Sequence, residues 1–477
     1  MPVFTELALT TQPQDLQCPG PLVVIGRRHR LLSAEVLALL PIDRPQVEAM
    51  LRELDPEDWG VSVSTFARGR KVVLGLLPER CSRHNSPSRA WAMPALCRQA
   101  GGKQDAALLI APDDPEHALA CCLSAARAFP RFSAKSGPSQ QRTVKLMVVC
   151  EGPLASPMLQ PAMDAVRLAG ELVDTPTAEL NTLTFTERAL AVARSVGAKA
   201  TVIAGEAVVE AGLGGLWSVG KAAVHKPALV VLEHQPAGAS RTVAWVGKGI
   251  VYDTGGLALK TKEGMPGMKG DMGGAAAVLG AFWAAARSGC PDHLIAVLCL
   301  AENAIGPEAT RPDDVVRMAS GRTVEINNPD AEGRVVLADG LSWLLHHHKP
   351  AWVADLATLT GAQLVATGKQ VAAIYSNDEG LEWATVAAGR RAGEPVHPLV
   401  YIPELLRKEL RSPVADMKNS VKDRNNAQSS CAALFIEEHL PPGAPPWVHV
   451  DICGPARDDE ERGSAFGVGL LLELLRS

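Results

Sequence analysis

Short runs of aliphatic and β-branched residues alternate along most of this chain with longer segments of helical character. In the later part such runs occupy residues 228–234, 242–247, 294–301, 352–357 and 447–452, and helical segments at 273–287 and 335–348 lie between several of them. Apolar strands that alternate with helices are typical of a largely parallel sheet covered on both faces. We therefore expect an α/β fold whose ligands bind beyond the carboxyl ends of the strands.

The first part of the chain has a less regular pattern. Strand-like runs at residues 21–26, 70–77, 105–112 and 143–150 are separated by mixed or helical segments. A length of 477 residues with 47% hydrophobic content exceeds the usual size of one domain. We expect a smaller N-terminal α/β domain over residues 1–160. A larger C-terminal domain over residues 161–477 should contain a central, largely parallel sheet flanked by helices.

Charge and composition narrow the classes of partner. The 47 basic and 52 acidic residues are mixed along the chain, which gives no electrostatic reason to expect nucleic acid or a membrane surface as partner. The longest apolar stretch, residues 272–286, is too short and too rich in alanine to span a bilayer. The start has no secretory pattern, and the ten cysteines include no C-x-x-C spacing. We expect a cytoplasmic protein that binds small molecules or peptides.

Seven charged residues lie close to the most apolar segments. One glycine-rich segment contains Lys248, Asp253, Lys260 and Asp271, and the sequence NNPDAEGR contributes Asp330, Glu332 and Arg334. We expect a strand to end at Gly247 and the following glycines to form turns that bring Lys248 and Asp253 toward one point. The alternate spacing of the other three predicts an extended stretch that directs them to one face.

Two kinds of site fit this constellation. The four carboxylates and three cations can form a buried ion-pair network with one negative charge left over. Alternatively, two divalent cations balance the four carboxylates, and a lysine with a lowered pKa adds a neutral amine ligand. Two such ions roughly 3.5–4 Å apart activate water and polarise a carbonyl or phosphoryl group. The pattern alone leaves both alternatives open.

Several separated segments resemble a known family. VGKGIVYDTGG, KGDMGGAA and NNPDAEGR, followed by DLATLTGA and HVDICG, are similar to the signature blocks of the leucyl aminopeptidase family of dinuclear metallopeptidases. The similarity is strongest from about residue 240 to 365 and weak before about residue 165. It implies a metal-dependent aminopeptidase that uses a metal-bridging water to hydrolyse the first bond of short peptides with a free N-terminus.

The resemblance also implies roles for the charged residues. The metal ligands would be Lys248, Asp253, Asp271, Asp330 and Glu332, with Asp253 and Glu332 bridging both ions. Zinc is the expected metal, and manganese or magnesium can substitute. Lys260 would polarise the substrate carbonyl and stabilise the oxyanion, and Arg334 would hold a bicarbonate ion that acts as general base.

A second group of residues is implied to bind substrate. Its members are Met268, Thr358, Leu359, Gly361, Cys453 and Ala456. Backbone groups around Leu359 and Gly361 would position the peptide, and the others would line the pocket for its first side chain. Cys453 is larger, and Ala456 smaller, than the residues of leucine-preferring members, so a preference for leucine is not inherited. The family resemblance further implies a homohexamer whose active sites face an internal cavity.

One departure from the family pattern motivates an alternative function. Pro329 stands where threonine is usual, which removes a backbone N–H and a hydroxyl directly before Asp330. A protein with this fold but weak or no catalysis would act as a binding or scaffolding subunit. A dinuclear phosphoesterase is a third candidate, although such sites usually include histidine ligands.

Other motifs are interpreted as structural. Residues 215–222, GLWSVGKA, come within one residue of a phosphate-binding loop, but Ala222 replaces the required hydroxyl and the preceding segment reads as helix. Three histidines at 346–348 are interpreted as a solvated helix end. His449 is expected to be a core histidine, and Asp451 is expected to support the site through hydrogen bonds.

Overall fold

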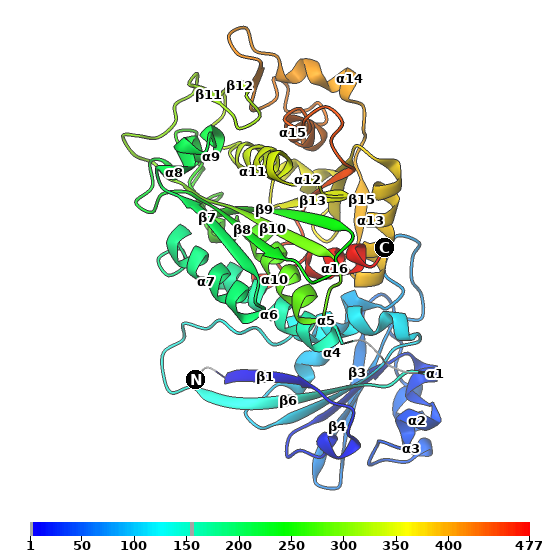
Figure 1. Cartoon of the computed structure of the whole chain (residues 1–477). Coiled ribbons are helices and arrows are strands. Elements are labelled where there is room, and N and C mark those ends of the chain that lie inside the picture. The colour runs from blue at the N-terminus through cyan, green and yellow to red at the C-terminus, as the bar shows by residue number, and fades with distance from the viewer. Residues whose placement is uncertain (1–2, 153–156) are drawn as a thin grey trace. The chain divides into compact units, whose positions relative to one another are not determined.

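The computed structural model describes residues 3–152 and 157–477, which belong to two compact units (Figure 1). The first unit comprises Met1–Leu168 and Ala387–Pro395, and the second comprises Ala169–Val386 and Val396–Ser477. The boundary expected between residues 160 and 161 stays a prediction, because a domain boundary is a statement about independent folding.

The first unit contains a six-stranded sheet in the order β1-β6-β5-β2-β4-β3. Its strands are β1 (Val3–Leu9), β2 (Leu22–Gly26), β3 (Val61–Ala67), β4 (Arg70–Leu76), β5 (Ala106–Ala111) and β6 (Gln140–Val148). All neighbours are parallel except β3 and β4. The helices are α1 (Arg28–Leu31), α2 (Ala34–Leu37), α3 (Arg44–Arg52), α4 (Met93–Cys97) and α5 (Ala118–Arg127). The four strands expected from the sequence are found, and β1 and β3 are additional.

The second unit contains an eight-stranded sheet in the order β15-β14-β17-β13-β9-β10-β8-β7. These strands are β7 (Lys199–Ala204), β8 (Ala228–His234), β9 (Thr242–Asp253), β10 (His293–Asn303), β13 (Trp352–Ala357), β14 (Ala372–Ser376), β15 (Val396–Pro398) and β17 (Trp447–Asp451). The four central strands, β17, β13, β9 and β10, are mutually parallel. Their carboxyl ends therefore meet at one edge of the sheet. The expected fold class is confirmed.

Helices cover both faces of this sheet, as Figure 1 shows. α10 (Gly273–Arg287) and α16 (Val468–Leu475) pack together on one face, and α9 (Gly214–Gly220), α11 (Gly333–His347) and α15 (Gln428–Glu437) pack on the other. The remaining helices of the chain's later part are α6 (Leu159–Asp174), α7 (Thr182–Ser195), α8 (Ala207–Glu210), α12 (Gly361–Ala366), α13 (Glu379–Ala392) and α14 (Pro403–Leu406). A small sheet, β11-β12-β16, lies apart from the large one and consists of Val315–Arg317, Thr323–Glu325 and Met417–Lys418.

The expected end of a strand at Gly247 is wrong. β9 continues to Asp253 because β10 pairs with it in parallel over nearly its whole length, from His293 opposite Thr242 to Asn303 opposite Asp253. Gly247 instead allows close packing, since a Cβ there would lie 2.5 Å from the Ala275 Cα of α10. The turn follows β9, at Gly255 and Gly256, whose φ angles are 83° and 58°.

The structural interpretations of the other motifs agree with the fold. Most of the segment 215–222 lies in α9, which α8 precedes, so no strand leads into it as a phosphate-binding loop requires. His346 and His347 are exposed in the last turn of α11. Within the described ranges, none of the helices has the length and apolar character needed to cross a membrane.

Candidate metal centre and substrate site

The charged residues singled out in the sequence converge at the carboxyl edge of the central strands. Lys248 and Asp253 lie on β9, Lys260 follows in the next loop, Asp271 lies between a 3-10 turn (Met268–Gly270) and α10, and Asp330, Glu332 and Arg334 lie at the start of α11. All of them belong to the second unit. Five are almost fully buried, namely Lys248, Asp253, Asp271, Glu332 and Arg334. The structure therefore brings all seven residues into one region.

The segment NNPDAEGR forms a turn and a helix start, so the expected extended stretch is wrong. The Ala331 N–H donates to the Asn328 carbonyl oxygen at 3.0 Å, and the Asp330 N–H donates to the Asn328 side chain at 3.1 Å. These bonds close a tight turn with Pro329 in its second position, where proline is favoured. Glu332 then takes the position directly before α11, and its side chain makes no capping hydrogen bond. The N–H that proline lacks is not needed in this turn.

Lys248 forms ion pairs with two of the carboxylates. Its Nζ lies 2.8 Å from Asp271 Oδ1 and 2.9 Å from Glu332 Oε1. The same ammonium donates to the carbonyl oxygen of Thr358 at 2.9 Å. With 2% of its surface exposed, Lys248 is held within the protein interior.

Lys260 joins the other two carboxylates. Its Nζ lies 2.7 Å from Asp253 Oδ2 and 2.6 Å from Asp330 Oδ1. The second oxygen of Asp253 accepts hydrogen bonds at 2.8 Å from the Gly255 N–H and from Asn303 Nδ2. Lys260 and Asp330 are the more open members of the group, with 17% and 33% of their side chains exposed.

Burial and mutual repulsion disfavour the charged form of the carboxylates. Burial, and then the neighbouring Asp253, raises the pKa of Glu332 to about 8. Burial raises the pKa of Asp271 to about 6, although Lys248 opposes the shift. A buried carboxylate is costly to ionise alone, and a bound cation stabilises its charged form.

Lys248 departs from the expectation of a lowered pKa. Burial lowers the pKa of this ammonium, but Asp271, Glu332 and Asp253 together raise it by more than burial lowers it. The net effect is a raised pKa. The carboxylates therefore keep the lysine protonated when they face no other cation. A metal ion at the same carboxylates reverses the local field, and the role of Lys248 as a neutral ligand stays a prediction.

The described residues fit a metal centre better than a closed ion-pair network. Oxygens of Asp253, Asp330 and Glu332 lie within 4.8 Å of one another. In the part of the chain that the structure covers, the buried Oδ2 of Asp271 and Oε2 of Glu332 have no hydrogen-bond partner. Arg334 donates to the Asn419 carbonyl oxygen, not to a carboxylate. Two lysines thus face four carboxylates, and the excess negative charge together with free oxygen ligands suits divalent cations.

Three of the expected substrate residues lie beside this centre. The Thr358 hydroxyl donates to Asp271 Oδ1 at 2.7 Å. A Cβ placed on Gly273 would lie 3.6 Å from Thr358 Cγ2 and 3.7 Å from Ala456 Cβ, so both side chains line one spot. Burial, with the charges of Asp451 and Asp271, raises the pKa of the Cys453 thiol to about 12. That thiol is therefore a neutral lining group.

Leu359, Gly361 and Met268 are the other three residues expected to bind substrate. The Leu359 N–H donates to Asp451 Oδ1 at 3.0 Å, so this backbone donor already has a partner within the protein. Gly361 begins α12 with open space around it, and Met268 is half-buried at the start of its 3-10 turn. The Met268 carbonyl oxygen accepts a hydrogen bond from the Asp271 N–H at 3.1 Å, so the backbone of Met268 adjoins the site.

Two asparagines at the site are not among the residues that the sequence predicts there. Asn303 ends β10 and contacts Asp253, and Asn419 contacts the NNPDAEGR segment. Asn303 had a signal, because it is a polar residue at the end of an apolar strand-like run. Asn419 had none, because its contacts join residues about ninety positions apart. Asp451, by contrast, forms the supporting hydrogen bonds expected of it.

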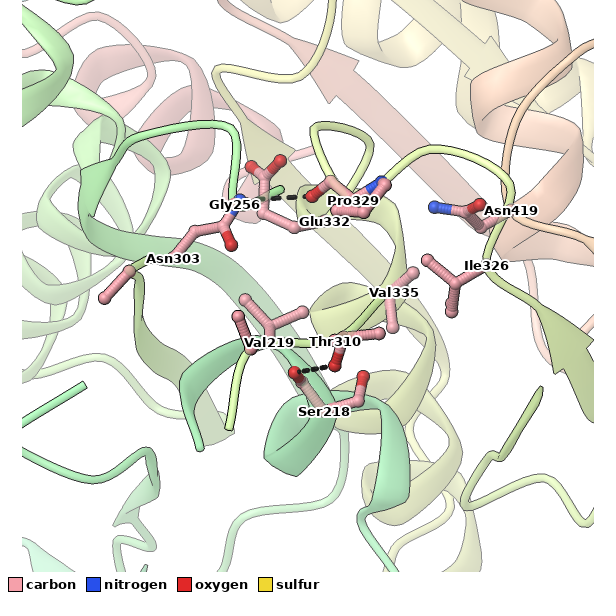
Figure 2. Close-up of a pocket in the computed structure, with 12 residues that line it drawn as sticks. Ser218, Val219, Gly256, Asn303, Thr310, Ile326, Pro329, Glu332, Val335 and Asn419 are labelled. Carbon is pink, nitrogen blue, oxygen red and sulfur yellow. Dashed lines mark hydrogen bonds between the residues drawn. The ribbon is translucent and has the colours of Figure 1, made fainter. Parts of the chain in front are cut away.

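A pocket lies beside the same segment, as Figure 2 shows. Pro329, Glu332, Asn303 and Asn419 line one part of it, and Val219 and Val335 contribute apolar surface. The pocket therefore borders the turn at Pro329 that precedes Asp330.

Comparisons with known proteins agree over the whole chain. The family model described as "Cytosol aminopeptidase family, catalytic domain" matches residues 167–472, and "M17 aminopeptidase N-terminal domain 2" matches residues 20–138. The human protein "Probable aminopeptidase NPEPL1" is 52% identical, over 99% of this chain and 92% of its own length.

Solved structures show the same similarity. Leucyl aminopeptidase from Trypanosoma brucei in complex with bestatin has a TM-score of 0.89 and 37% identity, covering 98% of this chain and 95% of that one. The bottromycin maturation enzyme BotP in complex with Mn has a TM-score of 0.80 and 30% identity, covering 96% of this chain and 99% of that one.

Proposed function

This chain belongs to the cytosol aminopeptidase family and is a metal-dependent aminopeptidase, and we propose that it hydrolyses the first bond of short peptides at a centre of two divalent metal ions. The observation that carries the proposal is a group of four carboxylates at the edge of the sheet, three of them buried, in which oxygens of Asp271 and Glu332 have no hydrogen-bond partner among the described residues.

The chain's own residues supply a complete ligand set. Asp253, Asp330 and Glu332 offer oxygens close enough to share ions, and Asp271 with Lys248 completes the set on the inner side. When bound, two such ions polarise the first carbonyl group of the peptide and lower the pKa of the attacking water. Zinc is the metal we propose, with manganese or magnesium as substitutes.

Lys260 is proposed to stabilise the oxyanion. Burial lowers the pKa of Lys260, but Asp253 and Asp330 raise it by more than burial lowers it. This amine therefore remains a cation. It approaches the carboxylates from the more open side of the site. A cation fixed where negative charge develops stabilises the transition state more than the ground state.

Arg334 is proposed to hold the general base. Its side chain is 4% exposed, and its Nε has no hydrogen-bond partner among the residues that the structure describes. Burial lowers the pKa of this guanidinium to about 10, which leaves it charged at neutral pH. A buried, charged donor of this kind suits a small planar anion such as bicarbonate.

Peptides with a free N-terminus and a small or medium first side chain are the proposed substrates. Thr358, Cys453 and Ala456 supply a neutral lining, and Cys453 occupies space that an alanine would leave open. We further propose that the protein assembles as a homohexamer and acts in the cytoplasm, as the family resemblance implies.

The scaffold alternative loses its motivation at Pro329. This residue occupies a turn position that favours proline, and its carbonyl oxygen accepts a hydrogen bond from Asn303 at 3.1 Å. Every charged group that hydrolysis requires is present beside it. The comparisons likewise favour an enzyme.

The test is release of N-terminal residues from a panel of dipeptides and aminoacyl-amides, with the matching N-acetylated compounds as controls. We expect turnover on free amines only, and highest rates for first side chains that fit beside Cys453 and Ala456. Equal rates on acetylated compounds would contradict an exopeptidase. Turnover confined to phosphate esters would point to the phosphoesterase.

A further inference from the structure

Asn419 makes an unusual number of contacts with one short segment. Its Oδ1 accepts the N–H groups of Asn327 and Asn328 at 3.0 and 3.2 Å. Its Nδ2 donates to the carbonyl oxygens of Asn328 and Ala331 at 2.7 and 3.2 Å. A side-chain amide has two donors and two acceptor lone pairs, so all four are used within this turn. With 1% exposure, no water competes for them.

The backbone of Asn419 extends the same contact to the catalytic arginine. Its carbonyl oxygen accepts a hydrogen bond from Arg334 Nη1 at 3.0 Å. Asn419 therefore contacts three parts of the site. It holds the turn that carries Asp330, it bonds to Ala331 between Asp330 and Glu332, and it accepts a hydrogen bond from the Arg334 guanidinium at the start of α11. Arg334 has no other hydrogen bond within residues 3–152 and 157–477.

The small sheet explains how Asn419 reaches this position. β16 (Met417–Lys418) pairs in parallel with β12 (Thr323–Glu325), and the Asn419 N–H donates to the Glu325 carbonyl oxygen at 3.1 Å. The residues after both strands therefore leave the sheet side by side. β12 leads into NNPDAEGR, and β16 delivers Asn419 against it.

Asn303 holds the other side of the turn. Its Nδ2 donates both to Asp253 Oδ1 at 2.8 Å and to the Pro329 carbonyl oxygen at 3.1 Å. Figure 2 shows Pro329 between Asn303 and Asn419. The Asn303 amide thus links the β9 carboxylate to the turn. The Asn419 amide holds the turn, and the Asn419 backbone carbonyl oxygen accepts the bond from Arg334 of α11.

We propose that Asn303 and Asn419 form an asparagine clamp that positions Asp330, Glu332 and Arg334 against Asp253, and so sets both metal affinity and turnover. The proposal rests on the proposed function for its effect on turnover, but not for its effect on metal affinity. Both asparagines are positioning residues, since they act through the turn and the carboxylates. Removing partners that orient metal ligands typically costs 10–100-fold in affinity or activity.

Three variants of the full-length protein test the clamp. Asn419→Asp keeps the side chain's shape and acceptor but removes both donors, Asn419→Ala removes all four bonds, and Asn303→Ser removes the link to Asp253. Asn425→Ala is the matched control, because Asn425 is exposed on the same segment and its hydrogen bond uses the backbone N–H. Ser420→Ala is a buried control beside Asn419.

Manganese or zinc alone is titrated into each metal-stripped protein by calorimetry, and kcat and KM are measured separately. We expect the dissociation constant for metal to rise at least tenfold and kcat to fall at least tenfold in the clamp variants, with KM within threefold. Excess metal should restore part of the activity. In the metal-free proteins, amide exchange in residues 326–333 should be faster in Asn419→Ala than in either control.

A purely structural role gives a different result. The clamp is refuted if its variants melt at lower temperature but keep metal affinity and kcat within twofold of the controls. If Asn419→Ala does not fold, Asn419→Asp and Asn303→Ser carry the test. An unmodified protein without peptidase activity would refute the proposed function, and the metal titration would still decide the clamp.

Discussion

Lys248 and Lys260 both contact carboxylates of the site, yet they differ in their partners and in their exposure to solvent. Lys248 lies in the interior between Asp271, Glu332 and the Thr358 carbonyl. Lys260 contacts Asp253 and Asp330 with 17% of its side chain exposed, so a peptide can reach it. We therefore propose that Lys248 supports the inner side of the metal centre and that Lys260 meets the substrate.

Substituting Glu332 and Lys260 separates metal binding from catalysis. Glu332→Ala removes oxygens from the shared group and should abolish hydrolysis and weaken metal binding. Lys260→Ala removes the cation that we propose stabilises the oxyanion, so turnover should fall by about 10²-fold or more while bound metal is retained. Metal content and kcat, measured in the same samples, check both outcomes. Lys262→Ala is the control, since Lys262 is an exposed lysine on the same loop. Undiminished turnover in Glu332→Ala would refute the site.

Pro329→Thr tests whether the unusual residue impairs the enzyme. Because proline suits the second position of the turn from Asn328 to Ala331, we expect kcat to stay within about threefold. The unfolding free energy should fall by about 0.4–1 kcal/mol, since threonine leaves the unfolded chain more freedom. Steady-state kinetics and urea unfolding measure these effects. A tenfold gain in kcat would show that proline holds the turn in a poor geometry.

At the scale of elements, the site depends on the close approach of β9 and α10. β9 carries Lys248 and Asp253, and the loop before α10 carries Asp271. Gly247 faces α10 across this contact, where an added Cβ would meet backbone atoms of Ala275 and Gly274. The distance between strand and helix therefore fixes the distance between Lys248 and Asp271.

Gly247→Ala should disturb this contact. The new Cβ would lie 2.5 Å from Ala275 Cα, so β9 or α10 must shift. We expect a loss of about 1–3 kcal/mol in unfolding free energy and weaker metal binding. Gly306→Ala is the control, because its nearest atom would lie 3.5 Å away. Urea midpoints measure the difference, and equal midpoints for the two variants would contradict the packing account.

Sequence patterns predicted the elements better than the site's local geometry. Apolar runs revealed the central strands, but the end of β9 was misplaced because pairing with β10 extends it past two glycines. The alternation of Asp330, Glu332 and Arg334 indicated an extended stretch, whereas hydrogen bonds to Asn328 close a turn. Periodicity reports local preference, and these two features are decided by tertiary contacts.

Across the whole molecule, the buried ionisable groups proposed to act in function differ from those expected to affect stability. The charged residues of the site were found from sequence because they share two short segments and a family pattern. His439, just after α15, gave no such signal. Its Nδ1 contacts the Ser320 hydroxyl at 2.6 Å, and its ring packs on Phe435.

His439 should make the fold sensitive to acid. Burial, then Arg322, lowers its pKa to about 3, whereas an unfolded histidine titrates near pH 6.5. The unfolded chain therefore binds more protons between these values, and stability falls as pH decreases from 6.5 toward 3. This group alone should cost about 2 kcal/mol at pH 5. Urea unfolding across pH should show a shallower slope for His439→Gln than for the control His346→Gln, which alters an exposed histidine. Equal slopes would contradict the assignment.

We propose that two divalent ions at the carboxyl edge of the sheet drive peptide hydrolysis. The most direct measurement is a titration of metal-stripped protein with zinc or manganese, in which native mass spectrometry counts bound ions and dipeptide turnover is measured in the same samples. We expect no turnover without metal, two ions bound per chain at saturation, and turnover that rises with their binding. Turnover that persists after metal removal, or two bound ions without turnover on any peptide, would contradict it.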